Sequence, residues 1–423
     1  MRRLTLDNGL RVVLDARAAA PVVGVAVHYG VGFRSEPVDR GGFAHLFEHL
    51  MFQGSARVAA GEHFSHVQRS GGTAGGSTHQ DYTDFYEIAP AAALERLLFL
   101  EADRMAGLRL TQHALDTQRR VVGEEILTNV TNRPYGGFPW TVLPGVLYSS
   151  YANAHNGYGD LSDLARATLP DCVAFHREHY LPDNAVLTVS GGFDDRRAED
   201  LVVRYFGAIP AGTGAPAASL AEPLPSTVLR GTYEDANAPL PALALGHRMP
   251  DPVSELPAYV AFMVLSTLLT GTDQCALSRR LLTETRLATA VRSGCGSFGP
   301  LQARDPDTFQ FVVTHFPQAA VEDVVAETDD VLRDLARRGP GPAELTSAAA
   351  RLRASTARGY DSLLTRTRHL GAFELLHGQP GLVDRLPSLV DAVGADDVAA
   401  AAGRLLAHPR AVLCLRTRQG AGV

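Results

Sequence analysis

The sequence of 423 residues contains no lysine, so all 39 of its basic residues are arginines. Its 46 acidic residues give a formal net charge of −7, which argues against a general nucleic-acid binder, because such proteins carry basic patches. No apolar run approaches the ~20 residues of a membrane-spanning helix. The N-terminus lacks the apolar core and cleavage site of a signal peptide. These absences predict a cytoplasmic protein with neither nucleic acid nor membrane among its partners.

Cysteine is scarce as well, with four residues far apart at Cys172, Cys275, Cys295 and Cys414. No pair has the C-x-x-C spacing, so neither a disulfide framework nor a cysteine zinc site is expected. Isolated buried thiols are the simplest interpretation. The hydrophobic share of 45% and the charged share of 20% are ordinary for a globular protein, and the length allows two or more domains.

The chain does contain a repeated α+β pattern. Residues 210–225 are rich in proline, alanine, glycine and serine, as interdomain linkers are. After them, residues 241–247 echo the apolar run at 21–27, and a long helix follows each run. We therefore predict an α+β fold of two homologous halves, each a mainly antiparallel sheet with helices packed on it. The predicted division is an N-terminal domain at 1–209, a linker at 210–226 and a C-terminal domain at 227–423.

Local patterns predict the elements of the first half. Two short strands flank an Asn8-Gly9 turn, the strongest short-range signal for a hairpin. Alternation of apolar residues predicts a strand over 22–29. Residues 91–105 have the pattern of a strongly apolar helix. Three of its charged residues are expected on the solvent side, namely Arg96, Glu101 and Arg104.

A five-residue motif carries the chemistry. His45 and His49 lie four positions apart in a helix expected over 41–53, so both imidazoles project from one face and can reach one cation. Imidazole nitrogen is a preferred zinc ligand. Glu48 neighbours both histidines and could move a proton for a metal-bound water. The order H-x-x-E-H is the inverzincin signature, so the motif predicts a zinc peptidase with one zinc ion per chain.

Two histidines do not complete a catalytic zinc site, which normally has three protein ligands. A second helix, expected over 111–128, offers the adjacent carboxylates of Glu124 and Glu125. Adjacent side chains on a helix point about 100° apart. One carboxylate should therefore ligate, while the other orients a histidine or faces elsewhere.

Longer segments resemble the pitrilysin family of zinc peptidases. Residues 42–55, GFAHLFEHLMFQGS, are similar to its metal helix almost residue for residue. Residues 121–126 are similar to the segment that carries its third ligand, and the likeness continues at 132–135, 183–186 and 373–378. It covers both halves, at the length of the short bacterial and mitochondrial-processing-peptidase-like members. The resemblance implies that the two halves form half of a clam-shell chamber.

The resemblance also implies roles for single residues. Zinc would be held by two histidines and one glutamate, namely His45, His49 and Glu125, since the family's register favours Glu125. Glu48 would take a proton from the attacking water and later deliver one to the leaving amine. Glu124 would be auxiliary to the site. Gln118 stands where the family often has a glutamate, so its role stays open.

The glycine-rich segment at 71–78 has two interpretations. It could be a phosphate loop, but it lacks the Gly-Lys-Ser/Thr ending. In the family, the matching segment is a sheet edge to which the substrate adds as an extra strand. The residues implied to bind substrate are Thr73, Ala74, Gly75, Gly76 and Ser77. Gly75 departs from the family, which commonly has an asparagine there, so one contact to the peptide would be missing.

The remaining histidines have no clear role. Three in the first half, His63, His66 and His79, have no ligand partner at a clear spacing and are expected to be surface or core residues. His176 and His179 could form a metal pair, but an ordinary helix face is favoured. The second half is not expected to bind metal, because apolar residues replace its metal helix, namely Phe262, Met263 and Leu265.

One departure from the family concerns partnership. Active single-chain members carry an arginine and a tyrosine, seven positions apart in the second half, that contact substrate and stabilise the oxyanion. Leu282 and Thr289 fall at these positions, although nearby arginines could substitute, namely Arg279, Arg280 or Arg286. We therefore predict the zinc subunit of a heterodimer, whose homologous partner supplies the arginine and tyrosine.

Three other interpretations stay open. The first is a self-sufficient homodimeric peptidase. The second is a non-catalytic structural subunit, like the core proteins of a respiratory complex, although such chains typically have degraded metal motifs. The third narrows the activity to removal of leaders from small peptides. In the main interpretation, the substrates are peptides or unfolded segments that fit an enclosed chamber.

Overall fold

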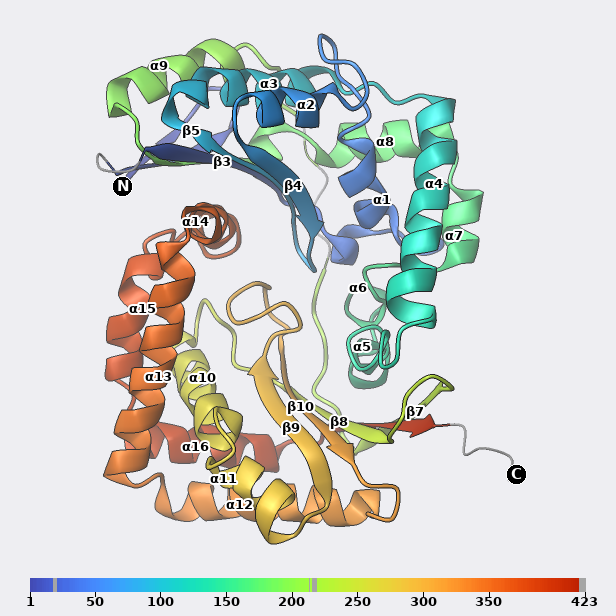
Figure 1. Ribbon diagram of the computed structural model, residues 1–423, viewed down its shortest axis with the longest axis vertical. Helices are drawn as coiled ribbons and strands as arrows, with labels where there is room; N and C mark the ends of the chain where they lie inside the picture. Colours follow the sequence, from blue (N-terminus) through green and yellow to red (C-terminus); the bar gives the residue numbers. More distant parts are fainter. Residues whose placement is uncertain (18–20, 213, 215–218, 418–423) are drawn as a thin grey trace. The chain divides into compact units, whose positions relative to one another are not determined.

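The computed structural model describes residues 1–17, 21–212, 214 and 219–417 (Figure 1). The chain divides into two compact units. The first unit consists of Met1–Glu124, Gly157–Ala218 and Arg358–Asp384, and the second of Glu125–Asn156, Ser219–Ala357 and Arg385–Val423. Each unit therefore includes a segment from the other half of the sequence, unlike the continuous domains predicted at 1–209 and 227–423. Part of the predicted linker, residues 213 and 215–218, lies outside the described residues.

The first unit is built on a six-stranded sheet in the order β1-β2-β6-β3-β5-β4. Its strands are β1 (Arg2–Thr5), β2 (Arg11–Ala16), β3 (Val22–Tyr29), β4 (Thr73–Thr78), β5 (Thr83–Pro90) and β6 (Ala185–Gly191). Neighbouring strands are antiparallel except β2 and β6. The predicted hairpin at Asn8-Gly9 and the strand over 22–29 are both confirmed. Every residue of β6 is buried, as expected for a central strand covered on both faces.

Helices cover both faces of this sheet. Figure 1 shows α2, α3 and α9 on one face and α14 on the other. The helices of the first unit are α1 (Phe43–Leu50), α2 (Glu62–Arg69), α3 (Leu94–Gly107), most of α4 (Gln112–Ile126), α7 (Leu161–Arg166), α8 (Leu169–His179), α9 (Asp195–Phe206) and α14 (Leu363–His377), with short 3₁₀ turns at η1 (Phe33–Ser35), η2 (Ala91–Ala93) and η4 (Pro182–Asn184). Helix α14 comes from the second half of the sequence and packs on β2, β3, β5 and β6.

The second unit repeats the topology of the first. Its sheet has the order β7-β11-β8-β10-β9, which matches β2-β6-β3-β5-β4 strand for strand. The pair β7–β11 is parallel, like β2–β6, and the other pairs are antiparallel. The strands are β7 (Leu229–Asp235), β8 (Ala242–Arg248), β9 (Ala288–Cys295), β10 (Thr308–His315) and β11 (Ala411–Thr417). The predicted α+β fold of two homologous halves is therefore confirmed.

The second unit has its own set of helices. They are α5 (Leu143–Leu147), α6 (Tyr151–Ala154), α10 (Leu256–Thr270), α11 (Ala276–Ser278), α12 (Val321–Arg338), α16 (Ala395–Ala407) and most of α13 (Pro342–Asp361) and α15 (Leu382–Asp391), with π-helical turns at η3 (Leu127–Thr131) and η5 (Arg279–Glu284). Helix α10 is buried around most of its circumference, because it packs on both β9 and α16. Throughout the described ranges, no helix is long and apolar enough to cross a membrane.

The structure corrects one prediction about α3. Arg96 is exposed, as predicted, but Glu101 and Arg104 are 0% and 1% exposed, so placing them on the solvent side was wrong. Their charges are paired inside the unit, where Arg104 donates to Glu101 and stacks over Phe85. A helical pattern cannot reveal such a pair, because its surroundings come from other elements.

Candidate metal centre

Helix α1 begins at a glycine that no other residue could replace without strain. Gly42 has φ 89°, in the left-handed region, and a Cβ there would lie 2.7 Å from the carbonyl oxygen of Tyr158. The Glu36 carboxylate accepts hydrogen bonds from the backbone nitrogens of Gly42 (2.9 Å) and Ala44 (2.7 Å). It thereby satisfies N–H groups that the first helical turn leaves free and complements the positive end of the helix dipole.

The apolar face of α1 anchors the helix in the first unit. Phe47 is fully buried and packs against Phe175 and Tyr180 at the C-terminal end of α8. The histidines share the opposite side, with ring centroids of His45 and His49 5.1 Å apart and ring planes at 84°. His45 is buried and His49 is half-buried. The structure thus brings the two imidazoles together from one helix face, as the four-residue spacing predicts.

Helix α4 brings the third donor. One ligand atom each from His45, His49 and Glu125 lie within 4.8 Å of one another. Glu125 is half-buried in this group, whereas the adjacent Glu124 is exposed and is not part of it. Gln118 is buried on the same helix, two turns earlier. The group has the nitrogen and oxygen donors that zinc prefers.

Tyr158 was missed by sequence reasoning. Its ring meets that of His45 edge to face, with centroids 4.8 Å apart and planes at 87°. It lies between α6 and α7, more than one hundred positions after His45, and nothing in the local pattern distinguishes it from other tyrosines in loops. An edge-to-face contact of this kind restricts the rotation of the imidazole ring.

Glu48 lies between the two histidines in sequence and faces the sheet. Its half-buried carboxylate accepts a hydrogen bond from the Thr78 hydroxyl, with Oγ1 to Oε2 at 2.8 Å. Thr78 is the last residue of β4. The sequence predicted a carboxylate beside the donor group but gave no indication of what holds it.

The glycine-rich segment forms strand β4, at the edge of the first sheet. Its residues pair with β5 on one side, from Thr73 opposite Ile88 to Thr78 opposite Thr83. In the part of the chain that the structure describes, no strand pairs with its other side. The backbone groups along that side are a template for an added strand. The five residues expected to bind substrate, Thr73 to Ser77, all lie on this strand.

A second group also brings donor atoms within 4.8 Å of one another, namely His63, Glu87 and Glu101. His63 Nε2 lies 2.8 Å from Glu87 Oε1, in line with the prediction of a core or surface histidine. Burial raises the pKa of Glu101 to about 8 and also raises that of Glu87. Because the Arg104 cation already neutralises one carboxylate, one proton on the other leaves the cluster neutral, whereas a divalent ion would leave a buried net charge. The group therefore fits a proton better than a metal.

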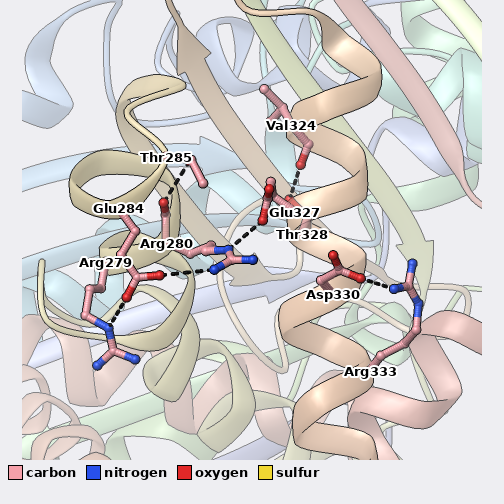
Figure 2. Close-up of polar contacts among 9 residues, drawn as sticks. All are labelled: Arg279, Arg280, Glu284, Thr285, Val324, Glu327, Thr328, Asp330 and Arg333. Atoms are coloured by element: carbon pink, nitrogen blue, oxygen red, sulfur yellow. Dashed lines mark hydrogen bonds and ion pairs between the residues drawn. The ribbon is translucent and has the colours of Figure 1, made fainter.

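The arginines and the threonine considered for the oxyanion role lie within or between η5 and β9 of the second half. Figure 2 shows that Arg279 and Arg280 both contact Glu284. Arg279 Nε is 3.0 Å from Glu284 Oε1, and Arg280 Nε is 2.5 Å from Glu327 Oε2. Arg286 is exposed and has no carboxylate partner among the residues that the structure describes. The exposed Thr289 is the second residue of β9 and donates a hydrogen bond to the Thr314 carbonyl.

The comparisons with known proteins agree with this architecture. Residues 11–134 match the family described as insulinase (peptidase family M16), and residues 166–352 match the peptidase M16 inactive domain. The zinc protease PqqE of Helicobacter pylori is 28% identical over 353 residues, which cover 81% of this chain and 76% of PqqE. An uncharacterised zinc protease of Bacillus subtilis, YmxG, is 25% identical over 421 residues, or 97% of each chain.

A solved structure gives the same result. The crystal structure of a protease from Helicobacter pylori matches with a TM-score of 0.88 and 25% identity, over 98% of this chain and 99% of that protein. Together the two family matches cover most of the chain. The resemblance to the pitrilysin family is confirmed, and the chain belongs to peptidase family M16.

Proposed function

We propose that this chain is a zinc-dependent endopeptidase whose metal is held by His45, His49 and Glu125. The observation that supports this most is the convergence of these donor atoms within 4.8 Å, with Glu48 beside them. Zinc bonds to nitrogen and oxygen at about 2.0–2.2 Å, so ligands around one ion lie some three to four ångströms apart. The upper bound of 4.8 Å on the observed group is compatible with that spacing, and relatives named as zinc proteases agree with the choice of metal.

In this proposal the chain's own residues divide the chemistry between them. When bound, zinc supplies a Lewis acid that polarises water and the peptide carbonyl. Glu48 accepts the proton of the attacking water and donates a proton to the leaving amine. Tyr158 limits the rotation of the His45 ring. Gln118 keeps an open role, and Glu124, which is exposed, needs none in the chemistry.

The proposed substrates are peptides or unfolded segments. An extended chain can pair its backbone with the free side of β4, so recognition depends on extension more than on sequence. Gly75 and Gly76 have no side chains, which allows the backbone of a peptide to approach this strand closely. Leader peptides of small precursors fit this requirement, as do other extended segments.

We further propose that the chain works with a homologous subunit that supplies an arginine and a tyrosine for the substrate. Leu282 cannot donate a hydrogen bond, and the hydroxyl of Thr289 is engaged with Thr314. Arg279 and Arg280 are held by carboxylates. Arg286 has no such partner in the described part of the chain, so a homodimer that uses Arg286 is the alternative. Loss of activity in Arg286→Ala without any added partner would favour that alternative.

The proposal is tested with purified full-length variants and two measurements, bound zinc and cleavage of quenched fluorescent peptides. Glu48→Gln keeps a side chain of the same shape, so zinc should stay near one per chain while cleavage is lost. Glu125→Ala should lose zinc, and the matched variant Glu124→Ala on the same helix should retain it. Near-normal cleavage by Glu48→Gln would overturn the proposal, and full zinc occupancy in Glu125→Ala would overturn the ligand assignment.

A further inference from the structure

Strand β4 has different neighbours on its two faces. Side chains alternate along a strand, so Gly76 and Thr78 face α1 whereas Gly75 and Ser77 face α14. On the α1 side, a Cβ at Gly76 would lie 3.1 Å from Glu48 Cγ, and Thr78 Oγ1 lies 2.8 Å from Glu48 Oε2. The missing side chain of Gly76 therefore leaves the space that the Glu48 side chain uses.

The opposite face of β4 is held by a buried ion pair. Ser77 donates a hydrogen bond to Asp84 Oδ1 at 2.6 Å. Arg368 of α14 donates to both carboxylate oxygens of Asp84, at 2.6 and 2.9 Å, and also contacts the Ser77 hydroxyl. Asp84 is completely buried. Bidentate pairs of this kind fix geometry as well as charge, so the strand has little freedom to shift along β5.

We propose that Thr78 is a positioning residue that couples peptide pairing on β4 to the alignment of Glu48. This inference rests on the proposed function. The Thr78 hydroxyl holds one oxygen of the Glu48 carboxylate and thereby restricts the orientation of the whole group. The same hydroxyl lies 3.4 Å from the Ala44 carbonyl, one turn earlier on α1, so its position is defined by the helix as well as by the strand. A peptide that pairs with the unpaired side of β4 adds a backbone constraint on that side, which reaches the Glu48 carboxylate through Thr78.

The test compares four full-length proteins: the wild type, Thr78→Val, Thr78→Ser and Thr5→Val. Valine has the shape of threonine without the hydroxyl, and serine restores the hydroxyl. Thr5 is an exposed threonine in β1, at the other edge of the same sheet, and serves as the matched control. Loss of a second-sphere hydrogen bond typically costs 10–100-fold in activity, so kcat of Thr78→Val should fall by about that factor.

The other readouts separate positioning from damage to the fold. KM for a quenched fluorescent peptide should stay nearly unchanged in Thr78→Val, because the lost contact acts on the reacting group and not on peptide pairing. Bound zinc and the melting temperature should match those of Thr5→Val. Thr78→Ser should recover most of the turnover. A kcat of Thr78→Val equal to that of the wild type would overturn the inference. Glu48→Gln, measured in the same assay, tests the proposed function separately.

A crystallographic comparison tests the role of Thr78 even if the purified chain alone has no peptidase activity. In zinc-loaded Thr78→Val crystals, the Glu48 carboxylate should leave its wild-type position or occupy several orientations. A carboxylate that keeps one wild-type orientation in the variant would overturn the inference. Activity in the wild type that survives Glu48→Gln would instead refute the proposed function, because Thr78 would then have no base to position.

Discussion

Replacing Glu101 with glutamine should change the pH dependence of stability of the first unit. Glu101 is completely buried beside Glu87, Arg104 and His63. Burial, together with the nearby Glu87, raises its pKa from 4.5 to about 8, although Arg104 opposes the shift. Glutamine has the shape of the protonated acid and still accepts the hydrogen bond from Arg104. The substitution therefore removes a titrating proton with little change in packing.

The sign of the effect follows from which state binds the proton more tightly. Between pH 4.5 and about 8 the folded chain retains this proton and the unfolded chain has lost it, so stability falls as pH rises. His63, whose pKa burial lowers to about 3, stays neutral in the folded chain and titrates near pH 6.5 only when the chain is unfolded, and it does so in the wild type and the variant alike. At 1.36 kcal/mol per pH unit, the wild type should lose about 2 kcal/mol between pH 6.5 and 8 that the variant does not lose.

The measurement is thermal unfolding of zinc-saturated protein at pH 6.5, 7.25 and 8, followed by circular dichroism. For a unit of this size, about 2 kcal/mol corresponds to a shift in melting temperature of roughly 4–8 °C. The control is Glu95→Gln, since Glu95 is on the same helix but its side chain is 41% exposed. Equal slopes of melting temperature against pH in the wild type and Glu101→Gln would refute a shared buried proton.

Three further predictions concern the support of the site. Arg368→Met should destabilise the first unit by about 3–5 kcal/mol at pH 7, because it leaves the Asp84 carboxylate buried without its cation. This loss of stability should shrink below pH 4, because Asp84 of the variant becomes protonated there, whereas Arg368 holds the pKa of Asp84 at about 2 in the wild type. Urea unfolding at pH 7 and below pH 4 measures the difference. Glu36→Gln should weaken the N-terminal cap of α1 by about 1 kcal/mol without loss of zinc at saturation, measured by unfolding and metal analysis. Gly42→Ala should lower zinc affinity, measured by competition with a chelating dye, because a Cβ there clashes with the Tyr158 backbone. If any of the three variants keeps the wild-type stability or zinc affinity, the contact that it changes does not support the site.

Much of the fold could be predicted from local patterns. The valine-rich run at 22–29 has the bounds of β3, and the repeat at 241–247 marks the corresponding strand β8 of the second sheet. The long helix expected after residues 241–247 is present as α10. Strand β9 was missed, because its polar and half-exposed residues lack a clear alternation.

The metal group was predictable for a specific reason. His45 and His49 share a helix, so their spacing alone places them on one face. Glu125 needed the family resemblance, since a single sequence cannot decide between two adjacent carboxylates. The structure distinguishes the two carboxylates, because Glu124 is exposed whereas Glu125 lies beside His45 and His49.

The H-x-x-E-H motif, the two α+β halves and the glycine-rich strand could all be recognised in the amino-acid sequence, because each depends on residues close together in the chain. The contacts that hold these parts in place come from residues far apart in the chain and are visible in the folded structure alone. Thr78 reaches Glu48, and Arg368 reaches Asp84 from 284 positions away. The folded structure also reversed the expected exposure of Glu101, whose neighbours come from other elements. Periodicity encodes which face of an element is apolar, but the order of strands and the packing of helices decide which polar groups meet.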